Sequence, residues 1–141
     1  MTNIVLVGFK RSPFTIANKG LLAGVRPEDI LSQVINDLIK TTNINKDDIE
    51  DIIAGCAYPE GAQGYNIAKI VSFMTGMPEH VGGMTINRWC GSSMQAIHSA
   101  AGAISMNAGK VFICCGIESM SSVPINGLNY SPHPELLKDQ P

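Results

Sequence analysis

Four short apolar runs, separated by stretches with helical periodicity, constrain the fold of this chain most strongly. They cover residues 4–9, 51–56, 81–86 and 110–115. A continuous apolar run of this length is typical of a strand buried on both faces, because a strand with one solvated face alternates apolar and polar residues. Such strands belong to parallel sheets that helices cover on both faces. The pattern therefore predicts an α/β fold.

Helical patterns fill the intervals between these runs. A helix is expected to begin at Pro27, with Glu28 and Asp29 in its first turn and Lys40 in its last, charges that suit the helix dipole. Its apolar residues recur every three to four positions, which indicates a surface helix packed on the sheet. A second helical pattern covers residues 65–74.

Composition narrows the class of protein. With 141 residues, 45% of them hydrophobic and 16% charged, the chain has enough apolar side chains to bury the core of one domain. A net charge of -2, with Lys and Arg scattered singly, provides no basic stripe for a nucleic acid. No apolar stretch approaches the ~20 residues that a membrane-spanning helix needs. Nucleic acid and a membrane span are therefore not expected.

The first residues and the cysteines indicate a compartment. Residues 1–3 lead directly into the first apolar run, without the pattern of a signal or transit peptide, so a cytoplasmic protein is expected. Four cysteines without paired C-x-x-C spacing fit reduced thiols better than disulfides or a zinc site. Cys114 and Cys115 are expected to be buried in one strand, and Cys56 to be a structural thiol at the end of another.

Cys90 occupies the position best suited to chemistry. An apolar strand leads into it and a small-residue stretch, 92–108, leads out, so the cysteine is predicted on a tight turn between strand and helix. Ser92 and Gln95 have the spacing of a capping box, which predicts a helix start near Ser92. The thiol would then face the positive end of the helix, where the thiolate is favoured. The alternative is a cysteine buried as a small hydrophobe.

The helix expected after Cys90 has apolar or small residues on every side, which predicts full burial and a site that excludes water. His98 is eight residues beyond the cysteine, ~12 Å along a helix, so it cannot be its base. We expect it to pack or hydrogen bond instead. His80 and His133 are equally unsuited to that role.

The segment Asn87-Arg-Trp-Cys-Gly-Ser-Ser-Met-Gln-Ala-Ile97 resembles the nucleophile motif of the thiolases. A second segment, Cys115-Gly-Ile-Glu-Ser-Met-Ser-Ser-Val-Pro124, is similar to the Glu-Ser-Met-Ser segment after the next strand in that family. Weaker matches at residues 11–14 and 55–68 occur in family order. The Gly-Ser-Ser-Met after Cys90 is most similar to the 3-ketoacyl-CoA thiolases of fatty-acid oxidation.

The resemblance implies a three-layer thiolase half-fold, truncated, with a mostly parallel mixed sheet and helices on both faces. Residues 1–123 would form an incomplete N-terminal domain. Residues 124–141 would begin the inserted loop region and are a candidate for disorder. The final strand of the half domain, the activating histidine and a second cysteine acting as acid and base would lie beyond this chain.

The resemblance also implies roles for particular residues. Cys90 would be the acyl-accepting nucleophile, with its own backbone N–H as one oxyanion donor, while Asn87, Glu118 and Met120 would support the site. Coenzyme A would take part as a substrate, and no metal or other cofactor is implied. The expected partners are acyl-CoA substrates, a C-terminal thiolase half, or further copies of the chain in a homo-oligomer.

Three functions remain open. The chain is an acyltransferase fragment, active when a companion supplies the later half, or a non-catalytic remnant that acts as an interaction module. The third alternative is a small α/β protein, unrelated to the family, whose Cys90 is a redox-sensing thiol. The first alternative predicts no thiolysis by the isolated chain.

Overall fold

A computed structural model describes residues 3–138 and contains one parallel three-stranded sheet. The strands are β1 (Asp51–Gly55), β2 (Gly82–Ile86) and β3 (Phe112–Gly116), in the spatial order β2-β1-β3. Gly55 pairs with Ile86 on one side and with Gly116 on the other. The three carboxyl ends therefore lie level at one edge of the sheet, and the loops that leave them meet there.

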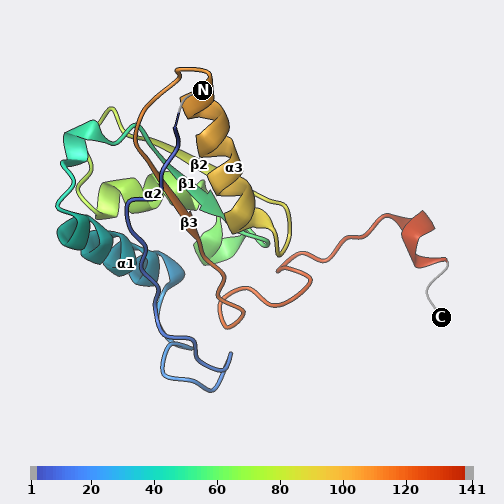
Figure 1. Cartoon of the computed structure of the whole chain (residues 1–141). Coiled ribbons are helices and arrows are strands. Elements are labelled where there is room, and N and C mark those ends of the chain that lie inside the picture. The colour runs from blue at the N-terminus through green and yellow to red at the C-terminus, as the bar shows by residue number, and fades with distance from the viewer. Residues whose placement is uncertain (1–2, 139–141) are drawn as a thin grey trace.

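Helices cover both faces of this sheet, which confirms the predicted α/β half-fold (Figure 1). Helices α1 (Pro27–Thr42) and α2 (Ile67–Met74) lie on one face, and α3 (Ser92–Ser105) lies on the other. Three short 3-10 helices, η1 (Lys46–Asp48), η2 (Gly61–Gln63) and η3 (Pro134–Leu137), lie in the connections. None of the helices within residues 3–138 combines the length and the apolarity needed to cross a membrane.

The core divides according to the alternation of side chains along β1. Ile52 and Ala54 point toward α1 and α2, where they join the larger buried cluster. Ile53 points the other way and packs with Ala96 and Ala100 of α3. Because both faces of β1 are buried, its sequence reads as a continuous apolar run, as expected for the central strand of a covered sheet.

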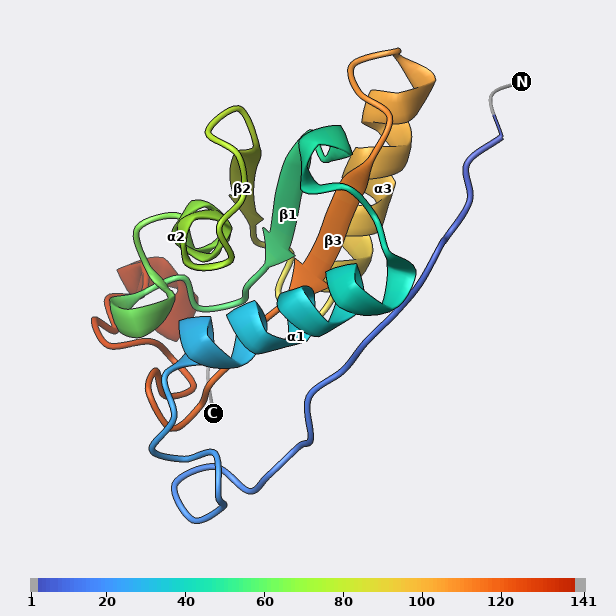
Figure 2. The ribbon, with the colours of Figure 1, turned by 90° about the vertical axis from the view of Figure 1, so that its left-hand side faces the viewer.

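The first apolar run is not a strand in this structure, so that prediction is wrong. Residues 4–9 are extended but lie outside the sheet, with Leu6 82% and Phe9 92% exposed. The segment passes along α1 on its way from the N-terminal end (Figure 2). Within residues 3–138 the segment pairs with neither outer edge of the sheet, on β2 or on β3, so no layer covers its apolar side chains.

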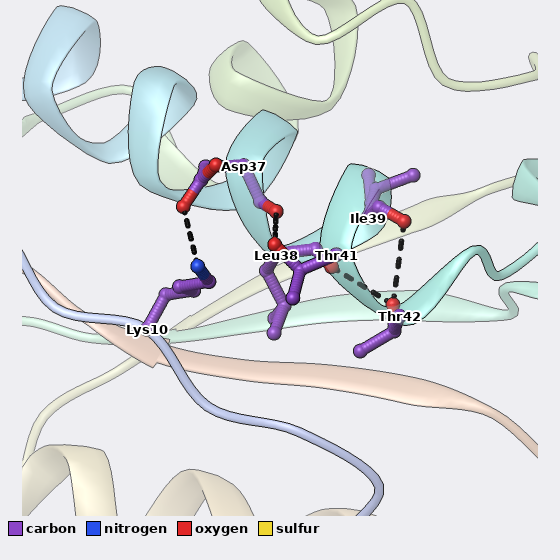
Figure 3. A network of polar contacts seen from close by, with 6 residues as sticks. All are labelled: Lys10, Asp37, Leu38, Ile39, Thr41 and Thr42. Carbon is purple, nitrogen blue, oxygen red and sulfur yellow. Dashed lines mark hydrogen bonds and ion pairs between the residues drawn. The ribbon is translucent and has the colours of Figure 1, made fainter.

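The N-terminal segment is held by side chains of α1 instead. Lys10 Nζ lies 2.8 Å from Asp37 Oδ2, an ion pair on the outer side of the helix (Figure 3). Gly8 approaches α1 so closely that an added Cβ would lie 2.5 Å from Thr42 Cγ2. The Thr42 hydroxyl donates to the carbonyl of Leu38, 2.8 Å away, within the last turns of the helix. These contacts fix where the segment lies without placing it in the core.

Helix α3 corrects a second prediction, since it is not buried on every side. Its buried positions are Ser92, Ala96 and Ala100, which face the sheet. Met94 is 54% and Ile97 42% exposed, so the opposite side faces solvent. An isolated sheet can cover one side of a helix, and the apolar residues on the other side have no neighbouring layer within residues 3–138.

The segment after β3 first packs on the body of the molecule, where Val123 is completely buried, and its later part extends away toward η3 (Figure 1). Apart from η3 it has no regular structure through residue 138, and most of its side chains are exposed. The expectation of an inserted loop region covers residues 124–141, of which residues 139–141 lie outside the described part.

Candidate active site

Cys90 lies in the loop 87–91, between the end of β2 and the start of α3, and its thiol is exposed. The helix begins at Ser92, as predicted. The predicted capping box is absent, because Ser92 is the first helical residue and Gly91 occupies the cap position. The Ser92 hydroxyl accepts from the Arg88 N–H at 2.8 Å and donates to the Trp89 carbonyl at 2.6 Å. It closes the turn that carries Cys90 rather than capping the helix.

Gln95, the other member of the expected box, also reaches back to this loop. Its Oε1 accepts from Arg88 Nη1 at 2.5 Å. A side chain in the first turn of the helix therefore orients the guanidinium two residues before the thiol.

The positions of the strand ends determine where α3 begins. A Cβ added to Gly55, the last residue of β1, would lie 2.4 Å from the Ser92 carbonyl carbon and from the Ser93 nitrogen. At Gly116, the last residue of β3, an added Cβ would collide with the Ser93 side chain. The first turn of α3 thus rests directly on β1 and β3, a contact that only glycine permits. This contact places the Cys90 loop over the carboxyl edge of the sheet.

Asn87 fixes the backbone next to the nucleophile candidate. Its Oδ1 accepts from the Trp89 N–H at 2.9 Å, and its Nδ2 donates to the Ala57 carbonyl at 2.8 Å. Trp89 has a φ of 51°, in the left-handed region that a bulky residue rarely adopts. Its ring meets that of Tyr58 edge-on, with centroids 6.1 Å apart. The strained turn is therefore held from two sides, by an amide and by an aromatic contact.

Glu118, two residues beyond the end of β3, holds Ala57 as well. Its Oε2 accepts from the Ala57 N–H at 2.7 Å, so both polar groups of Ala57 are engaged by residues from the neighbouring loops. Its Oε1 accepts from Gln63 Nε2 at 2.8 Å. Two of the predicted support residues, Asn87 and Glu118, are thus brought together through Ala57.

Gln63 was not identified from the sequence. It is the one completely buried polar side chain of the loop between β1 and α2. It stands among turn-forming residues, where a long amide gives no periodic or spacing signal. Only its surroundings in three dimensions reveal that it contacts Tyr58, Glu118 and Ser119.

The remaining predicted site residues lie apart from this network. Met120, two residues beyond Glu118, is partly exposed. His98 is exposed on α3 rather than packed, contrary to expectation, and His80 is exposed as well. Within residues 3–138, no three His, Cys, Asp or Glu side chains gather closely enough to ligate a metal ion.

The other cysteines differ from Cys90 in their surroundings. Burial raises the pKa of the Cys56 thiol to about 12, and the charge of Glu118, 3.9 Å from its sulfur, adds to the shift. Burial likewise raises the pKa of Cys115 to about 12 and shifts that of Cys114 upward. These thiols remain protonated at neutral pH, in keeping with their expected structural role, and all four cysteines are free.

Comparisons with known proteins agree with this arrangement. Residues 4–137 match the family description "Thiolase, N-terminal domain". The 3-ketoacyl-CoA thiolase of Aeromonas salmonicida is 38% identical over 134 residues, which is 94% of this chain and 35% of the relative. That of Colwellia psychrerythraea is 38% identical over 126 residues, or 89% of this chain and 33% of the relative.

A solved structure shows the same similarity in three dimensions. The acetyl-CoA acetyltransferase of Bacillus anthracis superposes with a TM-score of 0.68 at 32% sequence identity. The superposition covers 73% of this chain and 26% of that one. The chain spans about a third of the length of the curated relatives it matches.

Proposed function

Because this chain belongs to the thiolase family and matches its N-terminal domain, we propose that Cys90 is a nucleophile that accepts an acyl group as a thioester. The observation that carries this proposal is the exposed Cys90 thiol on the turn before α3, in contrast to three thiols that are buried or half-buried. An exposed thiol is one that a substrate can reach. Covalent catalysis then divides one difficult displacement into two easier ones.

The proposed substrate is a 3-ketoacyl-CoA, because relatives carry the name 3-ketoacyl-CoA thiolase. The Cys90 thiolate attacks the 3-keto carbonyl, and the bond between C2 and C3 breaks. Acetyl-CoA leaves as its enolate, which gains a proton in place of the one that the thiol lost. The acyl group remains on Cys90 until the thiol of a second coenzyme A displaces it and returns a proton to the cysteine. The backbone N–H of Cys90 serves as one donor to the oxyanion.

The proton-handling groups are proposed to come from outside residues 3–138. His98 lies six residues into α3, about 9 Å along its axis from Ser92, and its side chain is exposed, so it is not placed for proton transfer to Cys90. In the thiolases that this chain resembles, a histidine and a second cysteine of the later half perform this role. We therefore propose a companion half, in the same protein or in a second chain. The four free cysteines support a reducing compartment such as the cytoplasm.

The test is acylation of the chain by acyl-CoA, followed by intact mass. We expect one acyl group on the wild-type chain, mapped to Cys90, and none on Cys90→Ser. The Cys114→Ser variant is the matched control and should be acylated like the wild type. Thiolysis is expected only after a C-terminal thiolase half is added. Acylation of Cys90→Ser to the wild-type level would contradict the proposal.

A second candidate, a non-catalytic interaction module, is favoured by the uncovered side of α3, where Met94 and Ile97 are exposed. The two candidates differ in what Cys90 does. An interaction module binds a thiolase half equally well as Cys90→Ser, and it does not become acylated in the complex.

A further inference from the structure

Gln63 makes three hydrogen bonds, one within its own loop and two to the segment after β3. Its Nε2 donates to the Tyr58 carbonyl and to Glu118 Oε1, both at 2.8 Å. Its Oε1 accepts from the Ser119 N–H at 2.5 Å. The side chain is completely buried, so no solvent replaces these partners. The amide therefore ties the loop after β1 to the segment after β3.

These bonds lead by a short path to the nucleophile loop. Glu118 receives the Ala57 N–H, and the Ala57 carbonyl receives the Asn87 amide. Asn87 in turn accepts from the backbone N–H of Trp89, the residue directly before Cys90. Tyr58, whose carbonyl Gln63 engages, also carries the ring that meets Trp89. Two connections, one polar and one aromatic, thus run from Gln63 to the residue before the thiol.

We propose that Gln63 is a positioning residue for the nucleophile loop 87–91, acting through Ala57, Tyr58 and Asn87. The proposal rests on the proposed function in that Cys90 is the nucleophile. The backbone of Trp89 is left-handed, and such a conformation persists only where its surroundings hold it. The turn therefore depends on the contacts that lead to it from Gln63. Without the Gln63 amide, the loop after β1 loses its bond to Ser119 and one of its two bonds to Glu118, and the turn at Trp89 relaxes.

A role in packing alone is the competing explanation, and the isosteric variant Gln63→Glu separates the two. This change keeps the volume but replaces both N–H donors with a carboxylate oxygen and places a second negative charge beside Glu118. The readout is hydrogen exchange of two backbone amides. Ser119 contacts Gln63 directly, whereas Trp89 is reached only through the path described above.

We expect exchange at both amides to become faster in Gln63→Glu, by about fivefold or more at Trp89, the factor that one net hydrogen bond is worth. The indole N–H resonance of Trp89, the single tryptophan of the chain, should shift with it. The matched control is Gln33→Glu on the exposed side of α1, which should leave both amides unchanged. A faster Ser119 with an unchanged Trp89 would overturn the proposal.

A paired variant tests the path itself. Adding Glu118→Gln to Gln63→Glu restores one donor and one acceptor between the two positions, so part of the Trp89 protection should return. If Gln63→Glu fails to fold, Glu118→Gln alone interrupts the same path and should accelerate exchange at Trp89. An unchanged Trp89 amide in a folded Glu118→Gln chain would contradict the proposal. Because exchange requires no acyl transfer, failure of acylation at Cys90 and failure of this coupling are distinguishable.

Discussion

At the scale of single residues, the four thiols differ because their surroundings differ. Cys56 is buried beside a carboxylate, whereas Cys90 stands exposed on a turn at the start of a helix. The sequence allowed this contrast to be predicted, since Cys56 ends an apolar strand and Cys90 precedes a capping-type residue. The means of closing the turn could not be predicted, because it depends on which way the Ser92 hydroxyl points.

Alkylation with iodoacetamide at pH 8 should therefore label Cys90 first. A thiol with a pKa of about 12, as at Cys56 and Cys115, is ionised in roughly one molecule in ten thousand at that pH. Their raised pKa values also mean that the stability these buried thiols contribute is complete below about pH 9 and is lost as the pH rises toward 12. Peptide mapping by mass spectrometry measures the order of labelling. Equal rates of alkylation at Cys56 and Cys90 in the folded chain would show that Cys56 is not buried.

Asn87→Ala should destabilise the chain by about 1 kcal/mol, since two hydrogen bonds are lost at a partly solvated position. It should also release the left-handed turn at Trp89. Urea denaturation gives the free energy of unfolding, and near-ultraviolet circular dichroism reports the Trp89 ring. Asn36→Ala, on the exposed side of α1, is the control and should cause no loss of stability, since alanine is the better helix former. A similar loss in both variants would mean that Asn87 has no special role in the loop.

At the scale of elements, the contact between strand ends and the start of α3 decides where the nucleophile loop lies. Gly55→Ala should destabilise the fold by roughly 1–3 kcal/mol, because its Cβ meets backbone atoms of Ser92 and Ser93 that cannot turn aside. Gly116→Ala should cost less, since the Ser93 hydroxyl it meets can rotate away. Denaturation midpoints measure both changes.

The matched control for these glycines is Gly102→Ala in the interior of α3, where an added Cβ meets nothing within 4 Å. This substitution should stabilise the helix by roughly 0.5–1 kcal/mol, because alanine loses less backbone freedom on folding. If Gly55→Ala behaved like Gly102→Ala, the first turn of α3 would not rest on the end of β1.

Predicting the elements from the sequence worked where local pattern and packing agree. Helix α1 begins at Pro27 as expected, and β1, β2 and β3 lie within or next to their predicted runs. The failures concern burial rather than periodicity. The apolar pattern of residues 4–9 predicted a buried strand, and that of α3 predicted a buried helix. Each prediction holds only if other elements pack against the apolar side chains. Whether those neighbours are present is a property of the assembled molecule, and no local pattern contains it.

The same limit applies to the candidate site. The Cys90 motif, Asn87 and Glu118 follow strand ends, so their meeting at one edge of a parallel sheet follows from the order of the elements. Gln63 does not follow a strand end, and its role depends on the path of an irregular loop. A buried amide in a turn-rich segment is visible only once the loops on either side have been placed.

At the scale of the whole molecule, the described residues form a small sheet with apolar surface left uncovered on two sides. Residues 4–9 are the clearer case, because their apolar side chains are exposed to solvent instead of being buried in the core. Replacing an exposed apolar residue by a polar one costs the fold little stability. Truncating a core residue costs more, because both the transfer free energy and the packing contacts of its side chain are lost. The position of residues 4–9 can therefore be tested through stability.

Leu6→Ser should change the free energy of unfolding by less than about 0.5 kcal/mol, because the Leu6 side chain is already largely exposed. Ile53→Ala, in the centre of β1, should cost about 2–5 kcal/mol. Both values come from urea denaturation at equal protein concentration, and binding of a hydrophobic dye should fall in Leu6→Ser because uncovered apolar area is removed. A loss at Leu6 comparable to that at Ile53 would mean that residues 4–9 join a sheet in solution, within one chain or between copies. A neutral Leu6 together with a costly Ile53 would place the stability of the fold in β1 and the helices that cover it.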